Sequence, residues 1–174
     1  MPVIISIDPG VSGTGVAIWD AETWDICVPP LEIANLYGHV KKKNLSDLDA
    51  EDHFTYQAYD IADQLEPFLS RECLQVYCEY PALFAGSAMS RACAVKGDLQ
   101  KLTFIIGVFA GYCRRRAVPI PFKPVRVNDW KGQLPKDVVN RRIVKVIPNV
   151  LDLNPTTHSY DAIGIGLYAK GCMP

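Results

Sequence analysis

Long hydrophobic runs and paired cysteines are both missing from this sequence of 174 residues. The longest apolar run, Leu102 to Cys113, is shorter than the roughly 20 residues that a membrane-spanning helix needs. Six cysteines are present, but no two have the CxxC spacing typical of zinc sites. We interpret them as buried hydrophobic residues in a reducing compartment. The start of the chain also lacks the basic and apolar segments of a secretory signal, so a cytoplasmic location is expected.

A large net charge is missing as well, since the formal charge is −1. That balance hides an asymmetry along the chain. Residues 1–94 carry five Lys or Arg against fourteen Asp or Glu, whereas residues 95–145 carry twelve against three. A segment this basic is typical of a face that meets a polyanion. An ordinary solvated surface would produce the same count, so charge alone leaves both interpretations open.

What is present is a composition suited to one folded domain. Hydrophobic residues make up 49% of the chain, which argues against disorder. The length is sufficient for one domain, residues 1–174, to bury a core. Apolar patterns predict a mixed α/β domain with the element order β-β-β-α-β-α-β-α-α. The expected strands are 3–7, 15–19, 24–28, 74–80 and 118–127, and the expected helices are 55–69, 89–116, 135–146 and 158–170. Residues 29–53 are expected to form a long surface connection.

Four side chains that can take part in chemistry stand where these elements begin or end. Asp8 closes the first strand, directly before Pro-Gly, and Glu79 lies near the end of the strand 74–80. His158 and Asp161 are three residues apart, so a helix places them on one face. A charge in an apolar strand is costly to bury without compensation. Carboxylate oxygens are ligands that suit Mg²⁺, so a divalent cation is the natural compensator.

Each of these residues also has an ordinary structural interpretation. Asp8 with Pro9 and Gly10 is a turn signature, and Glu79 is compatible with the edge of an exposed strand. His158 is compatible with a surface position at a helix start, and Asp161 with a charge that complements the helix amino end. The metal hypothesis depends on the conjunction, because one site requires all four side chains in a workable order.

Three segments carry a resemblance to a known family. They are residues 5–10 (ISIDPG) with 14–17 (TGVA), residues 76–81 (VYCEYP) and residues 158–162 (HSYDA). Together they resemble the RuvC-like branch of the ribonuclease-H-like superfamily, across nearly the whole chain. The resemblance implies a mixed sheet with amino-terminal antiparallel strands flanked by helices. The compact, divergent form resembles a bacteriophage version, which would act in the host cytoplasm.

The resemblance also implies an activity, that of a Holliday junction resolvase. Asp8, Glu79, His158 and Asp161 would be its catalytic, metal-binding residues. The implied chemistry is two-metal phosphodiester hydrolysis with Mg²⁺, for which Mn²⁺ can substitute. Its products carry 5′-phosphate and 3′-hydroxyl ends. Whether His158 is a ligand or orients water is left open.

The basic segment supplies candidate DNA contacts. Lys131 and Lys136 flank the start of a helix, whose amino end can itself hold an anion, and the corresponding stretch of RuvC-like enzymes carries DNA-contacting lysines. The further candidates on this surface are Lys123, Arg126 and Arg141. Phe84 is compatible either with a wedge that stacks at the junction centre or with the core.

The helix expected over residues 89–113 is too apolar all round for a surface helix. Core burial explains this, and so does the homodimer that RuvC-like resolvases form through the equivalent helix. A two-fold dimer suits a four-way junction that is nicked symmetrically. The alternatives are a less selective structure-dependent DNA nuclease, a phosphate-binding module of the sugar-kinase and actin type, and a non-catalytic DNA-binding scaffold. Chain length argues against the phosphate-binding module.

Overall fold

A five-stranded mixed sheet forms the centre of the protein, in a computed structural model that describes residues 1–11, 13–27, 31–34, 58–69, 72–81, 97–132 and 134–173. The strand order is β3-β2-β1-β4-β5. The first three strands pair antiparallel, whereas β4 runs parallel to both β1 and β5. The strands are β1 (Val3–Asp8), β2 (Gly13–Asp20), β3 (Leu31–Ala34), β4 (Cys73–Tyr80) and β5 (Phe122–Arg126). The predicted mixed sheet with an antiparallel amino-terminal part is confirmed.

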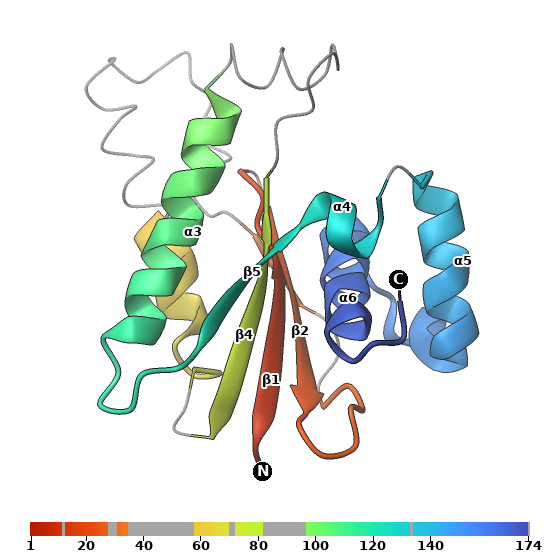
Figure 1. Ribbon diagram of the computed structural model, residues 1–174, viewed down its shortest axis with the longest axis horizontal. Coiled ribbons are helices and arrows are strands. Elements are labelled where there is room, and N and C mark those ends of the chain that lie inside the picture. The colour runs from red at the N-terminus through yellow and green to blue at the C-terminus, as the bar shows by residue number, and fades with distance from the viewer. Residues whose placement is uncertain are drawn as a thin grey trace.

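Helices cover both faces of this sheet (Figure 1). One face is covered by α3 (Asp98–Arg114) and by a helix over residues 58–65. The other is covered by α6 (Thr157–Ala169), with α5 (Lys136–Val146) outside it. Two short elements complete this second layer: α4 (Val127–Trp130) directly after β5, and the 3-10 helix η2 (Pro148–Leu153) before α6. The α3 face and the α6 face are named by these helices below.

Alternation along the strands divides their side chains between the two faces. In β1, Ile5 and Ile7 join the apolar cluster on the α3 face, whereas Ile4 joins the cluster on the α6 face. Successive side chains of a strand point to opposite faces. Asp8 therefore lies on the α6 face, as Ile4 does. By the same alternation Glu79 shares the α6 face with Tyr77 of the same strand.

Glycine lets α6 lie close to the sheet and to Trp130 of α4. A Cβ atom on Gly15 of β2 would stand 2.1 Å from the carbonyl oxygen of His158. On α6 itself, a Cβ on Gly164 would lie 2.4 Å from the ring of Trp130. Both positions therefore require glycine, because no side chain fits at these distances. The first turns of α6 are thus held against the ends of β1 and β2.

The strand predicted at 24–28 is wrong, and the third strand is Leu31–Ala34 instead. The Asp20 side chain accepts hydrogen bonds from the backbone N–H groups of Glu22 and Thr23, both at 2.8 Å, and this turn carries the chain away from the sheet edge. Trp24 then has a φ of 62°. Ile26 makes only an isolated bridge to Trp19. The connection predicted over 29–53 therefore contains a strand at its start.

Other element boundaries were predicted more closely. Helices 135–146 and 158–170 are confirmed within one residue. The last strand begins at Phe122 rather than 118, since Pro119 and Pro121 have no N–H group to donate to a neighbouring strand. The helix predicted over 55–69 ends at residue 65. The predicted start of the helix 89–116 lies outside the described residues, and the described part ends at Arg114.

Candidate functional site

Three carboxylates converge at the carboxyl ends of β1 and β4. Asp8 is the last residue of β1, and Glu79 follows Cys78, the register partner of Ile7. Parallel neighbours end at the same edge of a sheet, so the two side chains lie together. The close packing of α6 on the sheet brings Asp161 against them. Asp8 and Asp161 are only 6% and 8% exposed, so solvent does little to screen their charges.

His158 contacts Asp8 directly. Its Nδ1 lies 2.8 Å from Asp8 Oδ2, which links the first strand to the first turn of α6. Burial raises the pKa of Asp8, and the nearby charge of Asp161 raises it further. The hydrogen bond from His158 opposes this but does not reverse it. The histidine therefore offsets only part of the effect of surroundings that favour the neutral form of this carboxyl group.

Glu79 is held by a tryptophan that the sequence analysis missed. Trp130 is 1% exposed, and its Nε1 donates a hydrogen bond of 2.9 Å to Glu79 Oε2. Burial, followed by the charge of Asp8, raises the pKa of Glu79 to about 7. Lys131 and the Trp130 hydrogen bond counteract this shift. One signal was available, because a buried indole N–H needs an acceptor and Trp130 directly precedes a candidate site lysine.

Two lysines lie among the carboxylates. Lys131 Nζ is 3.8 Å from Glu79 Oε2 and 3.5 Å from Asp161 Oδ2. Lys136 Nζ is 3.2 Å from Asp161 Oδ2 and donates to the carbonyl oxygen of Thr157 at 3.4 Å. The structure thus places both lysines, predicted as DNA contacts, next to the predicted metal ligands.

The donor chemistry of this cluster fits a hard divalent cation. Asp8, Glu79 and Asp161 supply carboxylate oxygens, and Asp161 Oδ1 is buried without a hydrogen-bond partner. As placed, no three His, Cys, Asp or Glu side chains within the described part of the chain lie close enough together to hold one ion. Ammonium groups balance the carboxylates in this arrangement. The metal-binding role of the four residues stays a prediction.

Three of the other predicted DNA contacts lie on β5 and α5. Lys123 and Arg126 are exposed on β5, and Lys123 Nζ lies 5.6 Å from the centroid of the Tyr77 ring. Arg141 pairs with Asp137 at 2.9 Å on the exposed side of α5. Phe84 lies outside the described residues.

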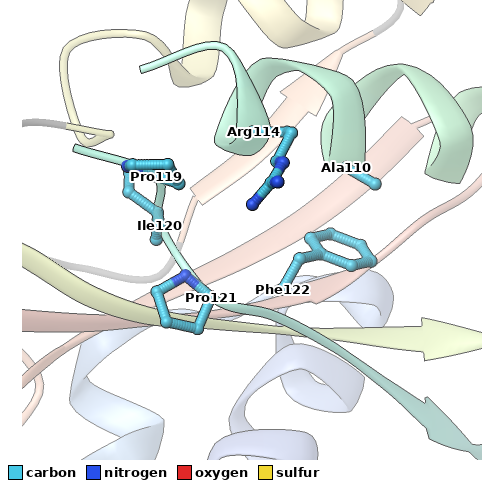
Figure 2. Close-up of a pocket in the computed structure, with 6 residues that line it drawn as sticks. All are labelled: Ala110, Arg114, Pro119, Ile120, Pro121 and Phe122. Atoms are coloured by element: carbon cyan, nitrogen blue, oxygen red, sulfur yellow. The ribbon is translucent and has the colours of Figure 1, made fainter. Parts of the chain in front are cut away.

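Surface pockets are found elsewhere, along α3. Figure 2 shows one of about 260 Å³ between the end of α3 and β5, which the side chains of Arg114 and Phe122 face. Two others, of about 340 and 400 Å³, include Tyr59 and Tyr112 in their walls. None of the three is lined by a candidate site residue. Among the helices of the described ranges, none is long and apolar enough to cross a membrane.

No protein-family model and no curated protein sequence matches the chain. Among solved structures, T. thermophilus RuvC in complex with Holliday junction substrate is similar, with a TM-score of 0.61 and 15% identity, over 97% of this chain and 92% of that one. Two structures of Aquifex aeolicus Ppx/GppA family proteins align with TM-scores of 0.31 and 0.30 at 9% and 11% identity. They cover 89% and 83% of this chain but 42% and 39% of theirs. A bacteriophage origin is not tested by these similarities. The chain has the fold of RuvC.

Proposed function

We propose that this protein is a divalent-metal-dependent endonuclease that cuts branched DNA, with four-way (Holliday) junctions as its substrate. The observation that carries the proposal is the convergence of Asp8, Glu79 and Asp161 beside Lys131 and Lys136. The shared fold supports it, since it extends over 97% of the chain and the similar RuvC structure holds a Holliday junction substrate.

The carboxylates would hold Mg²⁺ or Mn²⁺, with His158 orienting Asp8 through its Nδ1 contact. Such ions, when bound, lower the pKa of a water nucleophile and stabilise the leaving 3′-oxygen, which yields 5′-phosphate and 3′-hydroxyl ends. Trp130 would fix one Glu79 oxygen and leave the other available. Burial and the charge of Asp8 raise the pKa of Glu79 to about 7, so a divalent ion held beside it would favour its ionised form.

Phosphate contacts would come from basic residues on both sides of the site. Lys136 begins α5, whose amino end favours an anion. The exposed side chains of Lys123, Arg126 and Arg141 would extend this surface. Such contacts position DNA without reading its sequence, which suits recognition by shape.

A homodimer through α3 would present two such sites to one junction. Phe104 is 41% exposed on this helix. A Cβ atom added to Gly107 or Gly111 would meet no atom of the described residues within 4 Å, so this part of the helix leaves room for a partner. A two-fold axis between copies would suit symmetric nicking. A protein that acts on cellular DNA would do so in the cytoplasm.

Asp8→Asn tests the proposal most simply. The amide retains the size of the side chain but removes the charge, so Mg²⁺-dependent cleavage of a synthetic four-way junction should be abolished while junction binding persists. Asp25→Asn, at an exposed turn, is the matched control and should cleave normally. Full activity of Asp8→Asn would remove Asp8 from the mechanism.

A substrate panel separates the alternatives. The proposal predicts that the junction is cleaved in preference to flaps, RNA–DNA hybrids and linear duplex. Equal cleavage of all of them would indicate a less selective nuclease. DNA binding without any divalent-ion effect on cleavage or stability would indicate a non-catalytic scaffold.

A further inference from the structure

The position of Lys131 is determined by more than attraction to acidic residues. Its ammonium lies 4.6 Å from the centroid of the Trp130 ring, a distance at which the ring face attracts a cation. Trp130 is in turn fixed by burial against Gly164 and by its hydrogen bond to Glu79. Only 25% of the Lys131 side chain is exposed. A rigid aromatic surface therefore holds this ammonium between two carboxylates.

The contacts of Lys131 involve two of the three carboxylates that would hold a metal ion. Glu79 Oε2 and Asp161 Oδ2 both face the same Nζ atom. Asp161 Oδ2 also faces Lys136, while its buried Oδ1 has no hydrogen-bond partner. The two ammonium groups supply positive charge to three carboxylates that would otherwise repel one another.

We propose that Lys131 is the resident cation of the metal-free site, and that a divalent ion binds by displacing its ammonium from Glu79 and Asp161. This inference rests on the proposed function, since it concerns the regulation of the same site. It explains why, while the lysine is in place, no three acidic or histidine side chains of the described residues lie close enough together to hold one ion. The displaced ammonium becomes available to a DNA phosphate, so metal binding and phosphate binding favour each other through one side chain.

Metal affinity in the absence of DNA tests the displacement. Lys131→Met retains most of the length of the side chain and removes its charge. Mn²⁺ titration followed by electron paramagnetic resonance should give an affinity about tenfold higher for this variant, because a unit charge close to both ligands is gone. Lys131→Arg keeps the charge and should restore wild-type affinity. Lys170→Met, at the opposite end of α6, makes the same charge change away from the site and should have no effect.

The rate of chemical modification of Lys131 is a second test of the displacement, and it needs no substitution. Acetylation of the wild-type protein, followed by mass spectrometry, should modify Lys131 faster when Mg²⁺ or Mn²⁺ is added, because displacement exposes its amine. The modification rate of Lys170 should not change.

The outcomes separate this inference from the proposed function. If wild type and Lys131→Met bind Mn²⁺ equally, or if Mg²⁺ leaves Lys131 acetylation unchanged, the displacement is overturned while the metal-dependent nuclease stands. If neither protein binds Mn²⁺, both are overturned. Binding by Lys131→Met alone would support the displacement in its strongest form.

Discussion

The two faces of the sheet differ in what they bury. On the α3 face, β1 and β2 contribute aliphatic side chains, and the one buried polar side chain that alternation assigns there is Thr14. The α6 face buries the other four of the described residues in this class: Ser6, Asp8, Ser159 and Asp161. Alternate side chains of β1 are buried on the two faces.

The difference indicates that one face mainly stabilises the fold, whereas the other positions the residues of the candidate site. An aliphatic layer contributes burial without constraining charge, whereas buried polar groups need partners at fixed positions. On the α6 face, Ser6 donates to the carbonyl oxygen of Ala162 at 2.7 Å and accepts from Trp19 Nε1 at 2.8 Å. The bond to Ala162 joins β1 to α6 beside the carboxylates, since Ser6 is two residues before Asp8 and Ala162 directly follows Asp161. The α3 face thus supports the sheet, and the α6 face positions the site.

Truncation of an apolar side chain in the core of the α3 face should give the largest loss of stability with the least effect on the site. Phe109 is 2% exposed on the α3 face. Phe109→Ala should lower the free energy of unfolding by about 3–5 kcal/mol, through lost burial and a cavity. Urea unfolding measures the loss. The Mn²⁺ affinity of the folded fraction should not change. A parallel fall in affinity would show that the two faces are not separable.

The pH dependence of stability should be specific to the α6 face. The pKa of Glu79 is raised from 4.5 to about 7, so the native state holds this proton more tightly than the unfolded chain does. Its contribution to stability is complete below pH 4.5 and is lost as the pH rises through 7. In Glu79→Gln, without metal, the decline in unfolding free energy between pH 4.5 and 8 should shrink by about 3 kcal/mol. The remaining decline comes from Asp8, whose pKa is also raised. Identical pH profiles for both proteins would contradict this assignment.

Removal of the Ser6 hydroxyl should lower the free energy of unfolding least of the three changes. It should nevertheless weaken metal binding at the site. Ser6→Ala leaves the Trp19 N–H without its acceptor, at a cost of about 1.5 kcal/mol in thermal or urea unfolding. Because α6 is then less firmly held to β1, Mn²⁺ affinity should fall, unlike in Phe109→Ala. An unchanged affinity would show that this contact serves stability alone.

Local patterns in the sequence predicted most of the fold. β1 and β4 are short apolar runs with clear stops, and α5 and α6 have the expected periodicity and starts. The third strand was misplaced because residues 24–28 look like a strand, while the Asp20 turn that diverts them depends on side-chain hydrogen bonds. Residues 31–34 are too short a segment to show a clear alternation of apolar and polar residues. They become a strand because they pair with β2 at the edge of the sheet.

The placement of the site was predictable, but its internal contacts were not. Asp8 and Glu79 stand at strand ends in the sequence itself, so their convergence follows from parallel pairing. The contact between Lys136 and Asp161 joins residues 25 apart, and that between Trp130 and Glu79 joins residues 51 apart. Both depend on how closely α6 packs, which is set by Gly15 and Gly164. No local pattern encodes such distances.

A crystal of the wild-type protein soaked in Mn²⁺ and examined by anomalous scattering tests the central claim most directly. We predict a peak between β1 and α6 that contacts oxygens of Asp8, Glu79 and Asp161, with the Lys131 ammonium turned away from both of its present partners. A site without a peak, in which Lys131 still bridges Glu79 and Asp161 at saturating Mn²⁺, would contradict it.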